Sequence, residues 1–158
     1  MYSPALTDFV FMVQDTSHMF VTGPSVIKTV TGEIVDMETL GGAKMHSTIS
    51  GCCHKAFQND IEAIASTRDL LHYFPQNCYE KRPHRLWSQF DRMNQSSCKI
   101  LNNIIPFDHS MPYDMKIILE NILDRNQFYE IMPAYAKNIL CGFGEVEGRV
   151  IGLVANQP

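Results

Sequence analysis

The sequence predicts an α/β protein, and three features of its 158 residues support this. Short apolar runs such as residues 9–13 have the length and composition of buried β-strands. Residues 57–71 place apolar side chains at intervals of three, four or seven, which is the pattern of an amphipathic helix. Residues 138–156 contain two apolar runs around Glu147-Gly148 and predict an antiparallel hairpin with a tight turn.

The composition narrows the classes of function. Hydrophobic residues make up 45% and charged residues 19%, as in globular proteins. The net charge of −4 and the scattered Lys and Arg residues argue against a nucleic-acid partner, and no apolar run is long enough to span a bilayer. The five cysteines match neither a zinc site nor a disulfide framework, so we expect reduced thiols and no metal.

The first third of the chain predicts two strands and two short helices. Residues 9–13 and 19–22 are apolar runs that predict strands buried on both faces. Residues 24–31 predict a helix with Pro24 in its first turn and Gly32 at its end. Residues 36–40 carry two acidic residues and predict another short helix.

Residues 40–54 form the candidate binding stretch, because glycine and histidine concentrate there. A glycine lets a ligand approach the main chain, and N–H groups at a helix start can bind an anion. The competing interpretation is a polar connection whose glycines serve turns only. His46 and His54 are spaced so that both could lie on one helical face, but the spacing does not match the common zinc patterns. Cys52 and Cys53 are either reactive thiolates or, more commonly, small buried residues.

The rest of the chain predicts a second group of elements. Residues 57–71 should bury one face of their helix, and residues 76–103 have no periodic pattern and predict a linker. A helix over residues 115–122 and a short strand or turn over 128–132 follow. We expect Glu145 and Glu147 on the hairpin to be solvated. The second arm of the hairpin is too apolar to stand alone, which predicts that the chain is a segment of a larger protein.

The chain resembles the carboxyltransferase β subunits of biotin-dependent acyl-CoA carboxylases. The resemblance rests on several motifs in the same order: Tyr2-Ser3-Pro4-Ala5-Leu6-Thr7-Asp8-Phe9, Met19-Phe20-Val21-Thr22-Gly23-Pro24, Val30-Thr31-Gly32-Glu33, Leu40-Gly41-Gly42-Ala43, Phe128-Tyr129-Glu130-Ile131, Tyr135-Ala136-Lys137-Asn138-Ile139 and Ala155-Asn156-Gln157-Pro158. The spacing of Ser50-Gly51 and His54 is closer to the propionyl- and acetyl-CoA branch than to the methylcrotonyl-CoA branch. Gly144-Glu145 departs from the family, which usually has alanine and arginine there.

The resemblance implies a crotonase-like fold, in which ββα units stack into a superhelix and two such halves follow one another. By this comparison, residues 1–77 belong to the later part of the N-terminal half. Residues 78–103 form the linker, and residues 104–158 begin the C-terminal half.

The resemblance also implies an enzyme that transfers a carboxyl group from carboxybiotin to the α-carbon of propionyl-CoA, which gives methylmalonyl-CoA. Acetyl-CoA carboxylases, methylmalonyl-CoA carboxyltransferases and decarboxylases are alternatives, as is a truncated protein without catalysis. In the family, backbone oxyanion holes stabilise the reaction, and their glycines lie before Tyr2 and beyond Pro158. We therefore expect no catalytic residue within this chain, and a fragment that is inactive alone.

Binding residues and partners follow from the same resemblance. The acyl-CoA region is predicted at Gly41, Gly42, Ala43, His46, Ser50, Gly51 and His54. The CoA- or biotin-facing region of the second half is predicted at Phe128, Tyr135, Lys137, Asn138, Asn156, Gln157 and Pro158. The expected partner is an α subunit that carries biotin and uses ATP in its biotin carboxylase, around a hexameric β core. The expected location is the mitochondrial matrix in a eukaryote or the cytoplasm in a bacterium.

Overall fold

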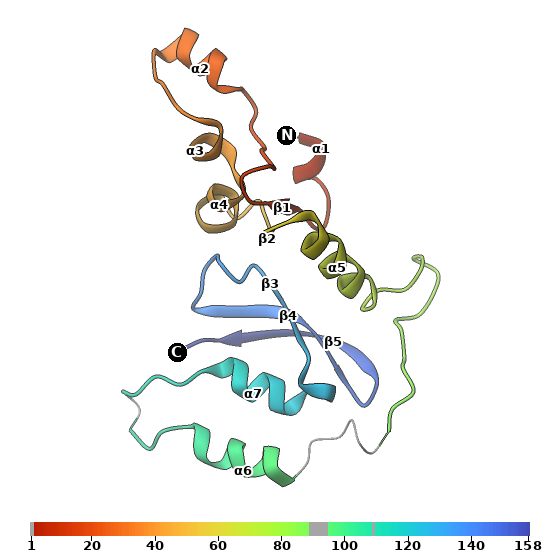
Figure 1. Cartoon of the computed structure of the whole chain (residues 1–158). Coiled ribbons are helices and arrows are strands. Elements are labelled where there is room, and N and C mark those ends of the chain that lie inside the picture. The colour runs from red at the N-terminus through yellow and green to blue at the C-terminus, as the bar shows by residue number, and fades with distance from the viewer. Residues whose placement is uncertain (1, 89–94, 109) are drawn as a thin grey trace. The chain divides into compact units, whose positions relative to one another are not determined.

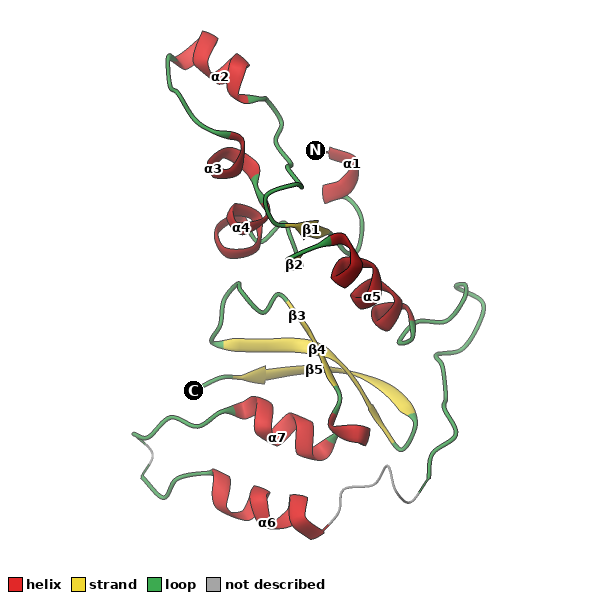
Figure 2. Cartoon of the chain, in the orientation of Figure 1, coloured by secondary structure: helices red, strands yellow, loops and turns green. Residues whose placement is uncertain are grey.

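The computed structural model describes residues 2–88, 95–108 and 110–158, and Figures 1 and 2 show its elements. The chain forms two compact units. Unit 1 consists of Met1–Thr67 and Met132–Ala136, and unit 2 consists of Arg68–Ile131 and Lys137–Pro158. A short segment from late in the sequence therefore belongs to unit 1.

Unit 1 is built on two parallel strands. β1 (Phe11–Val13) pairs with β2 (Lys55–Phe57), with Phe11 opposite Lys55 and Val13 opposite Phe57. The small core beside them contains Val10, Met12, Ala43 and Cys53. The strand expected over residues 9–13 is confirmed. β2 was not predicted, because its pairing partner lies far away in the sequence.

Unit 1 also contains four short helices. They are α1 (Tyr2–Ala5), α2 (Pro24–Thr31), α3 (Met37–Gly41) and α4 (Ala43–Met45). The predictions for α2 and α3 are confirmed. Gly32 ends α2 with a φ of 79°, a value that suits glycine. The Asp36 carboxylate caps α3 by accepting a hydrogen bond from the N–H of Thr39, and this bond lowers the pKa of Asp36.

The strand predicted over residues 19–22 is wrong. These residues form coil and a bend, and the side chain of Val21 is 63% exposed. The backbone of Met19 is used in another way: its N–H donates to the carbonyl oxygen of Gly41 over 2.8 Å, and its own carbonyl oxygen binds Nε2 of His46. An apolar run alone did not reveal these non-local partners.

The candidate stretch is largely helical. After α4, residues His46–Ser50 form one turn of π-helix, η1, and Gly51 follows in the left-handed conformation with a φ of 70°. The long helix α5 (Asp60–Leu71) begins later than predicted, because Phe57 belongs to β2. The expected buried stripe is also wrong: Leu70 is the buried residue of α5, whereas Ile61 is 80% exposed.

Unit 2 contains helices α6 (Gln95–Ile104) and α7 (Met115–Ile122) and a 3₁₀ turn, η3 (Asp124–Asn126). The helix predicted over residues 115–122 is confirmed. α6 occupies part of the region predicted as a linker without regular structure, but the division of the chain into two crotonase-like halves stays a prediction. Among the described residues, no helix has both the length and the apolar character needed to cross a membrane.

The sheet of unit 2 has the strand order β3-β4-β5. β3 (Phe128–Ile131) and β4 (Ile139–Val146) are antiparallel, and β4 continues into β5 (Arg149–Asn156) through Glu147 and Gly148. These two turn residues have φ values of 50° and 70°, as a tight hairpin turn requires. The strand over residues 128–132 and the hairpin are both confirmed.

Candidate functional site

A cavity of about 410 Å³ lies in unit 1, and several residues of the candidate binding stretch line it. The described residues that line it are Gln14, Lys44, Ser47, Thr48, His54, Lys55, Ala56, Pro133 and Ala134. They include two lysines and a histidine, and none of them is acidic. The cavity therefore has a positive electrostatic character.

His54 has a fixed hydrogen-bonding state. The N–H of Val10 donates to Nδ1 of His54 over 2.9 Å, so this nitrogen is the acceptor and the hydrogen of the neutral ring is on Nε2. The ring also packs at a tilt against Phe9, with centroids 5.6 Å apart. Partial burial lowers the pKa of His54, because a charged imidazolium would lose solvation. His54 is thus a neutral donor near pH 7.

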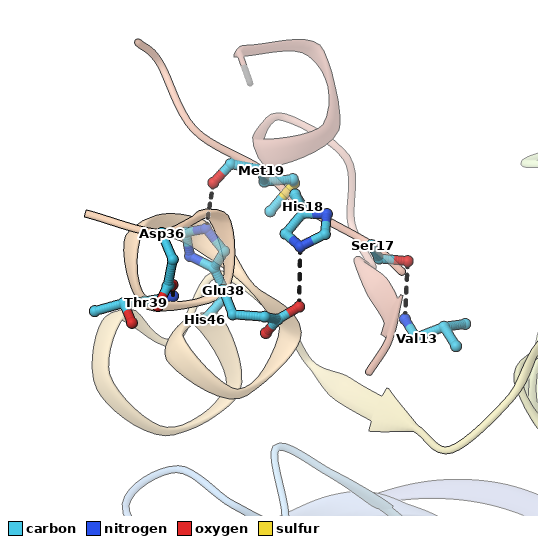
Figure 3. Close-up of polar contacts among 8 residues, drawn as sticks. All are labelled: Val13, Ser17, His18, Met19, Asp36, Glu38, Thr39 and His46. Atoms are coloured by element: carbon cyan, nitrogen blue, oxygen red, sulfur yellow. Dashed lines mark hydrogen bonds and ion pairs between the residues drawn. The ribbon is translucent and has the colours of Figure 1, made fainter. Parts of the chain in front are cut away.

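His46 is positioned by the fold itself. It is 3% exposed, Nδ1 lies 2.8 Å from Oγ of Ser50, and Nε2 binds the carbonyl oxygen of Met19 (Figure 3). Both ring nitrogens therefore have partners within unit 1. The imidazole of His46 thus connects the π-helical turn to the loop after β1 through its contacts with Ser50 and Met19. It has a structural role in this chain.

Gly41 and Gly42 are required by close contacts inside unit 1. A Cβ atom at Gly41 would overlap the carbonyl oxygen of Met19, and one at Gly42 would overlap the Glu38 carboxylate. The same carboxylate lies 3.0 Å from Nε2 of His18 (Figure 3). Ala43, which follows the two glycines, is fully buried in the core. The small residues of this motif thus allow chain segments to approach one another.

Gly51 and Ser50 lie at the end of the π-helical turn. A Cβ atom at Gly51 would come within 3.1 Å of the Tyr135 ring, so this ring covers the glycine. Tyr135 belongs to the segment Met132–Ala136, whose N–H at Met132 donates to the carbonyl oxygen of His54 over 2.8 Å. The structure therefore brings Tyr135, predicted for the second region, next to residues predicted for the first.

The adjacent cysteines differ in environment. Cys53 is fully buried and its thiol donates to the carbonyl oxygen of Lys55 over 3.1 Å. Burial raises the pKa of the Cys53 thiol, which disfavours the nucleophilic thiolate at neutral pH. Cys52 is half-buried, and both are reduced. Cys53 is thus a small core residue, as the commoner interpretation of the sequence predicted.

Apart from Tyr135, the residues predicted for the CoA- or biotin-facing region lie in unit 2. Gln157 joins the end of the sheet to the start of α7: its Oε1 accepts from the N–H of Met115 over 2.9 Å, and its Nε2 donates to Asp114 over 3.1 Å. Its own N–H donates to the carbonyl oxygen of Asn138 over 2.8 Å. Phe128 lines a second cavity of about 380 Å³, and Lys137, Asn156 and Pro158 are exposed.

The prediction that Glu145 is solvated is wrong. Its side chain is 8% exposed, and Oε1 lies 3.1 Å from Nε of Arg85. The pair does not have good hydrogen-bond geometry, since Oε1 has no hydrogen-bond partner among the described residues. Arg85 comes from the region predicted as a linker, and its N–H donates to the carbonyl oxygen of Gly148 over 2.9 Å. Glu147 is exposed, as predicted.

Among the residues predicted for the acyl-CoA region, His54 lines the unit 1 cavity. Lys44 and Lys55 also line it and were missed, although both lie beside predicted residues. A signal was available in the sequence: two lysines and no acidic residue lie between residues 40 and 55. Within the described ranges, His, Cys, Asp and Glu side chains form no group of three or more that could hold a metal ion.

Comparison with known proteins places these features in a family. The profile of the carboxyl transferase domain matches residues 1–158. The chain belongs to this family. It is 47% identical over 158 residues to the mitochondrial propionyl-CoA carboxylase beta chain of Homo sapiens. It is 49% identical over 158 residues to the propionyl-CoA carboxylase beta chain of Roseobacter denitrificans. It is 45% identical over 157 residues to the methylmalonyl-CoA decarboxylase subunit alpha of Veillonella parvula.

Each of these matches covers 99% of this chain, which spans 29% of the human relative and 30% of the two bacterial ones. Among solved structures, hexameric transcarboxylase 12S with hydrolysed methylmalonyl-coenzyme A bound matches with a TM-score of 0.89 and 39% identity, over 99% of this chain and 30% of that one. A single-chain long-chain acyl-CoA carboxylase matches at a TM-score of 0.77 and 19% identity, which bears on the fold alone. The predicted crotonase-like fold of this carboxyl transferase domain is confirmed.

Proposed function

We propose that this protein takes part in biotin-dependent carboxylation of a short acyl-CoA, with propionyl-CoA as the preferred substrate. The observation that carries the proposal is the 45–49% identity to propionyl-CoA carboxylase beta chains, which extends over 99% of this chain. The chain spans about three tenths of the length of these relatives. The part of the reaction that we assign to it is the supply of binding surface.

The reaction breaks the N–C bond of carboxybiotin and forms a C–C bond at the α-carbon of the acyl-CoA, while the α-proton moves to the biotin nitrogen. In this chain, unit 1 provides the acyl-CoA region around Gly41, Gly42 and His54. His46 and Tyr135 support this region by fixing the π-helical turn. The residues from Phe128 to Pro158 in unit 2 provide the start of the second binding region.

The proposal includes partners. A separate subunit carries biotin and the ATP-using biotin carboxylase, and the carboxyltransferase subunits form a hexamer like that named for transcarboxylase 12S. The proposed location is the mitochondrial matrix in a eukaryote or the cytoplasm in a bacterium. The first is supported by the mammalian relatives, whose names include the word mitochondrial. Division into halves at residues 1–77 and 104–158 belongs to the same proposal.

The test purifies the protein from its source with its bound partners and supplies ATP, labelled bicarbonate and propionyl-CoA. We expect label in methylmalonyl-CoA and complete inhibition by avidin. Acetyl-CoA, given in a parallel reaction, should react more slowly. No incorporation with either acyl-CoA, in a preparation that retains biotin, would overturn the proposal.

One alternative has its own support, because the decarboxylase subunit of Veillonella parvula is almost as similar as the carboxylases. A decarboxylase would release carbon dioxide from methylmalonyl-CoA without ATP. The same preparation, given labelled methylmalonyl-CoA and no ATP, distinguishes the two activities. Release of labelled carbon dioxide without carboxylation of propionyl-CoA would favour the decarboxylase.

A further inference from the structure

The cavity of about 380 Å³ in unit 2, which we call the unit 2 cavity, brings side chains of both charges together. Every described residue that lines it belongs to unit 2. The charged residues of the lining are Asp69, Arg85 and Glu120, and they lie beside the aromatic rings of Tyr73 and Phe128. The described linings of this cavity and of the unit 1 cavity have no residue in common.

Two carboxylates line the unit 2 cavity without a partner in the fold. Asp69 lies in the last turn of α5 and Glu120 lies in α7, so two different elements bring a negative charge to the same space. Neither carboxylate forms a hydrogen bond or an ion pair with another described residue. A positively charged donor on a ligand is the partner that such carboxylates bind most strongly.

Arg85 supplies the opposite charge. Its Nε lies 3.1 Å from Oε1 of Glu145, but this oxygen has no hydrogen-bond partner among the described residues. The contact therefore balances the charge of Arg85 without using its donors. No described residue accepts a hydrogen bond from this guanidinium, whose planar fork of N–H groups matches the two oxygens of a carboxylate.

Tyr73 lies within electrostatic range of both charges. Burial is the main cause that raises the pKa of Tyr73, while the negative charges of Glu145 and Asp69 add to this effect and the positive charge of Arg85 opposes it. The phenol is therefore neutral near pH 7. Its ring packs against the ring of Tyr129 with centroids 5.8 Å apart, which gives the cavity an apolar part beside the charged groups.

The size of the cavity suits a small organic molecule. A volume of about 380 Å³ exceeds by far the roughly 30 Å³ that one water molecule occupies. A simple cation would leave the guanidinium of Arg85 without an acceptor. A simple anion would leave the carboxylates of Asp69 and Glu120 without a donor.

We propose that the unit 2 cavity binds a zwitterion of the amino-carboxylic acid class. The ammonium group of this ligand lies between Asp69 and Glu120, and its carboxylate binds the guanidinium of Arg85. The inference goes beyond the proposed function, because neither propionyl-CoA nor carboxybiotin contains an ammonium group.

The experiment measures binding of labelled amino acids to the purified chain by equilibrium dialysis. The probes are glycine, β-alanine, 4-aminobutyrate and 6-aminohexanoate, whose two charged groups lie progressively further apart. We expect saturable binding that is strongest for one of the four. The amine and the carboxylic acid that each keep one charged group of that probe should bind at least about tenfold more weakly, since a charge-assisted hydrogen bond is lost.

Three substitutions test the assigned residues. Asp69→Asn, Glu120→Gln and Arg85→Lys should each weaken binding of the best probe about tenfold. Asp69 and Glu120 are exposed, so their variants should remain folded, and Arg85→Lys keeps the charge beside Glu145. Glu80→Gln is the matched control for Glu120→Gln, because Glu80 is an exposed acid of unit 2 outside the lining of the cavity.

Three results would overturn the proposal. They are the absence of saturable binding with all four probes, equal affinity for the best probe and one of its singly charged analogues, and an equal loss of affinity in Glu80→Gln and Glu120→Gln. None of these measurements needs catalysis. Failure here therefore leaves the carboxylation assay to decide the proposed function separately.

Discussion

Val10 and His54 form two hydrogen bonds with each other across 44 positions of sequence. The N–H of Val10 donates to Nδ1 of His54 over 2.9 Å, and the N–H of His54 donates to the carbonyl oxygen of Val10 over 2.8 Å. The side chain of His54 thus binds the backbone just before β1, and His54 also lines the unit 1 cavity. His54 therefore links the small core around Val10 to the unit 1 cavity.

This pairing predicts a pH dependence of stability. Burial lowers the pKa of His54 in the folded chain below its ordinary value of 6.5, so the unfolded chain binds more protons near that pH. The contribution of His54 is fully present above the unfolded pKa and is lost as the pH falls through the folded pKa. We expect the free energy of unfolding, from urea titrations, to fall as the pH is lowered from about 7.5 to below the ordinary histidine pKa of about 6.5.

The variant His54→Asn isolates this contribution. Its amide oxygen can replace Nδ1 as the acceptor for Val10, but it does not titrate, so the slope with pH should become smaller. His72→Asn is the control, because His72 is exposed and should leave the slope unchanged. An equal slope in the unchanged chain and in His54→Asn would contradict the prediction.

The close contacts at Gly41 predict that alanine is not tolerated there. A Cβ atom would overlap the carbonyl oxygen of Met19, which cannot move without breaking its bond to His46. We expect Gly41→Ala to reduce the free energy of unfolding by about 1–3 kcal/mol, the usual range for overpacking. Gly152→Ala should change it little, since among the described residues, apart from Gly152 and its chain neighbours, no atom lies within 4 Å of a Cβ at this position. Similar losses in both variants would show that the contact is not responsible.

Asp114 should stabilise the start of α7. Its Oδ1 accepts from the N–H of Lys116 over 2.9 Å and from Nε2 of Gln157 over 3.1 Å. Asp114→Ala should cost about 1 kcal/mol, as expected for loss of an N-cap, and Asp114→Asn should cost less because it keeps the acceptor. Thermal unfolding of the three proteins checks this order. Equal losses of stability in Asp114→Ala and Asp114→Asn would contradict the prediction.

The contact between Arg85 and Glu145 predicts that substitutions of these two residues have non-additive effects on the free energy of unfolding. Removing Arg85 leaves a buried carboxylate without its nearby positive charge, so Arg85→Met should destabilise by about 1–3 kcal/mol. Glu145→Gln removes the charge that needs compensation and should cost less. In Arg85→Met with Glu145→Gln, we expect part of the loss to be recovered. A strictly additive double-mutant cycle would exclude coupling between the two side chains.

Local signals in the sequence predicted local structure well. The turn at Glu147-Gly148 and the proline at the start of α2 each act within a few residues, and the elements they specify are present. The fold family followed from ordered motifs along nearly the whole chain. The predicted binding region included His54, which does line the unit 1 cavity.

The failures share one cause, which is contact between residues distant in sequence. β2 forms because β1 lies beside it, and the burial of Glu145 depends on Arg85. The periodic pattern of α5 predicted a buried stripe that includes Ile61, but this residue is 80% exposed, because periodicity does not say whether another element packs on that face. Lys44 and Lys55 resemble ordinary surface lysines until α4 and β2 come together at the cavity.

The parallel pairing of β1 and β2 has a consequence for the order of folding. Its strands can meet only after a long intervening loop closes, whereas β4 and β5 are joined by a two-residue turn. Loop closure costs entropy before any contact forms, and hairpins form in about 1–10 μs. We therefore expect the hairpin amides to gain protection from hydrogen exchange first in a refolding pulse experiment. Earlier protection at β1 and β2 would reverse this order.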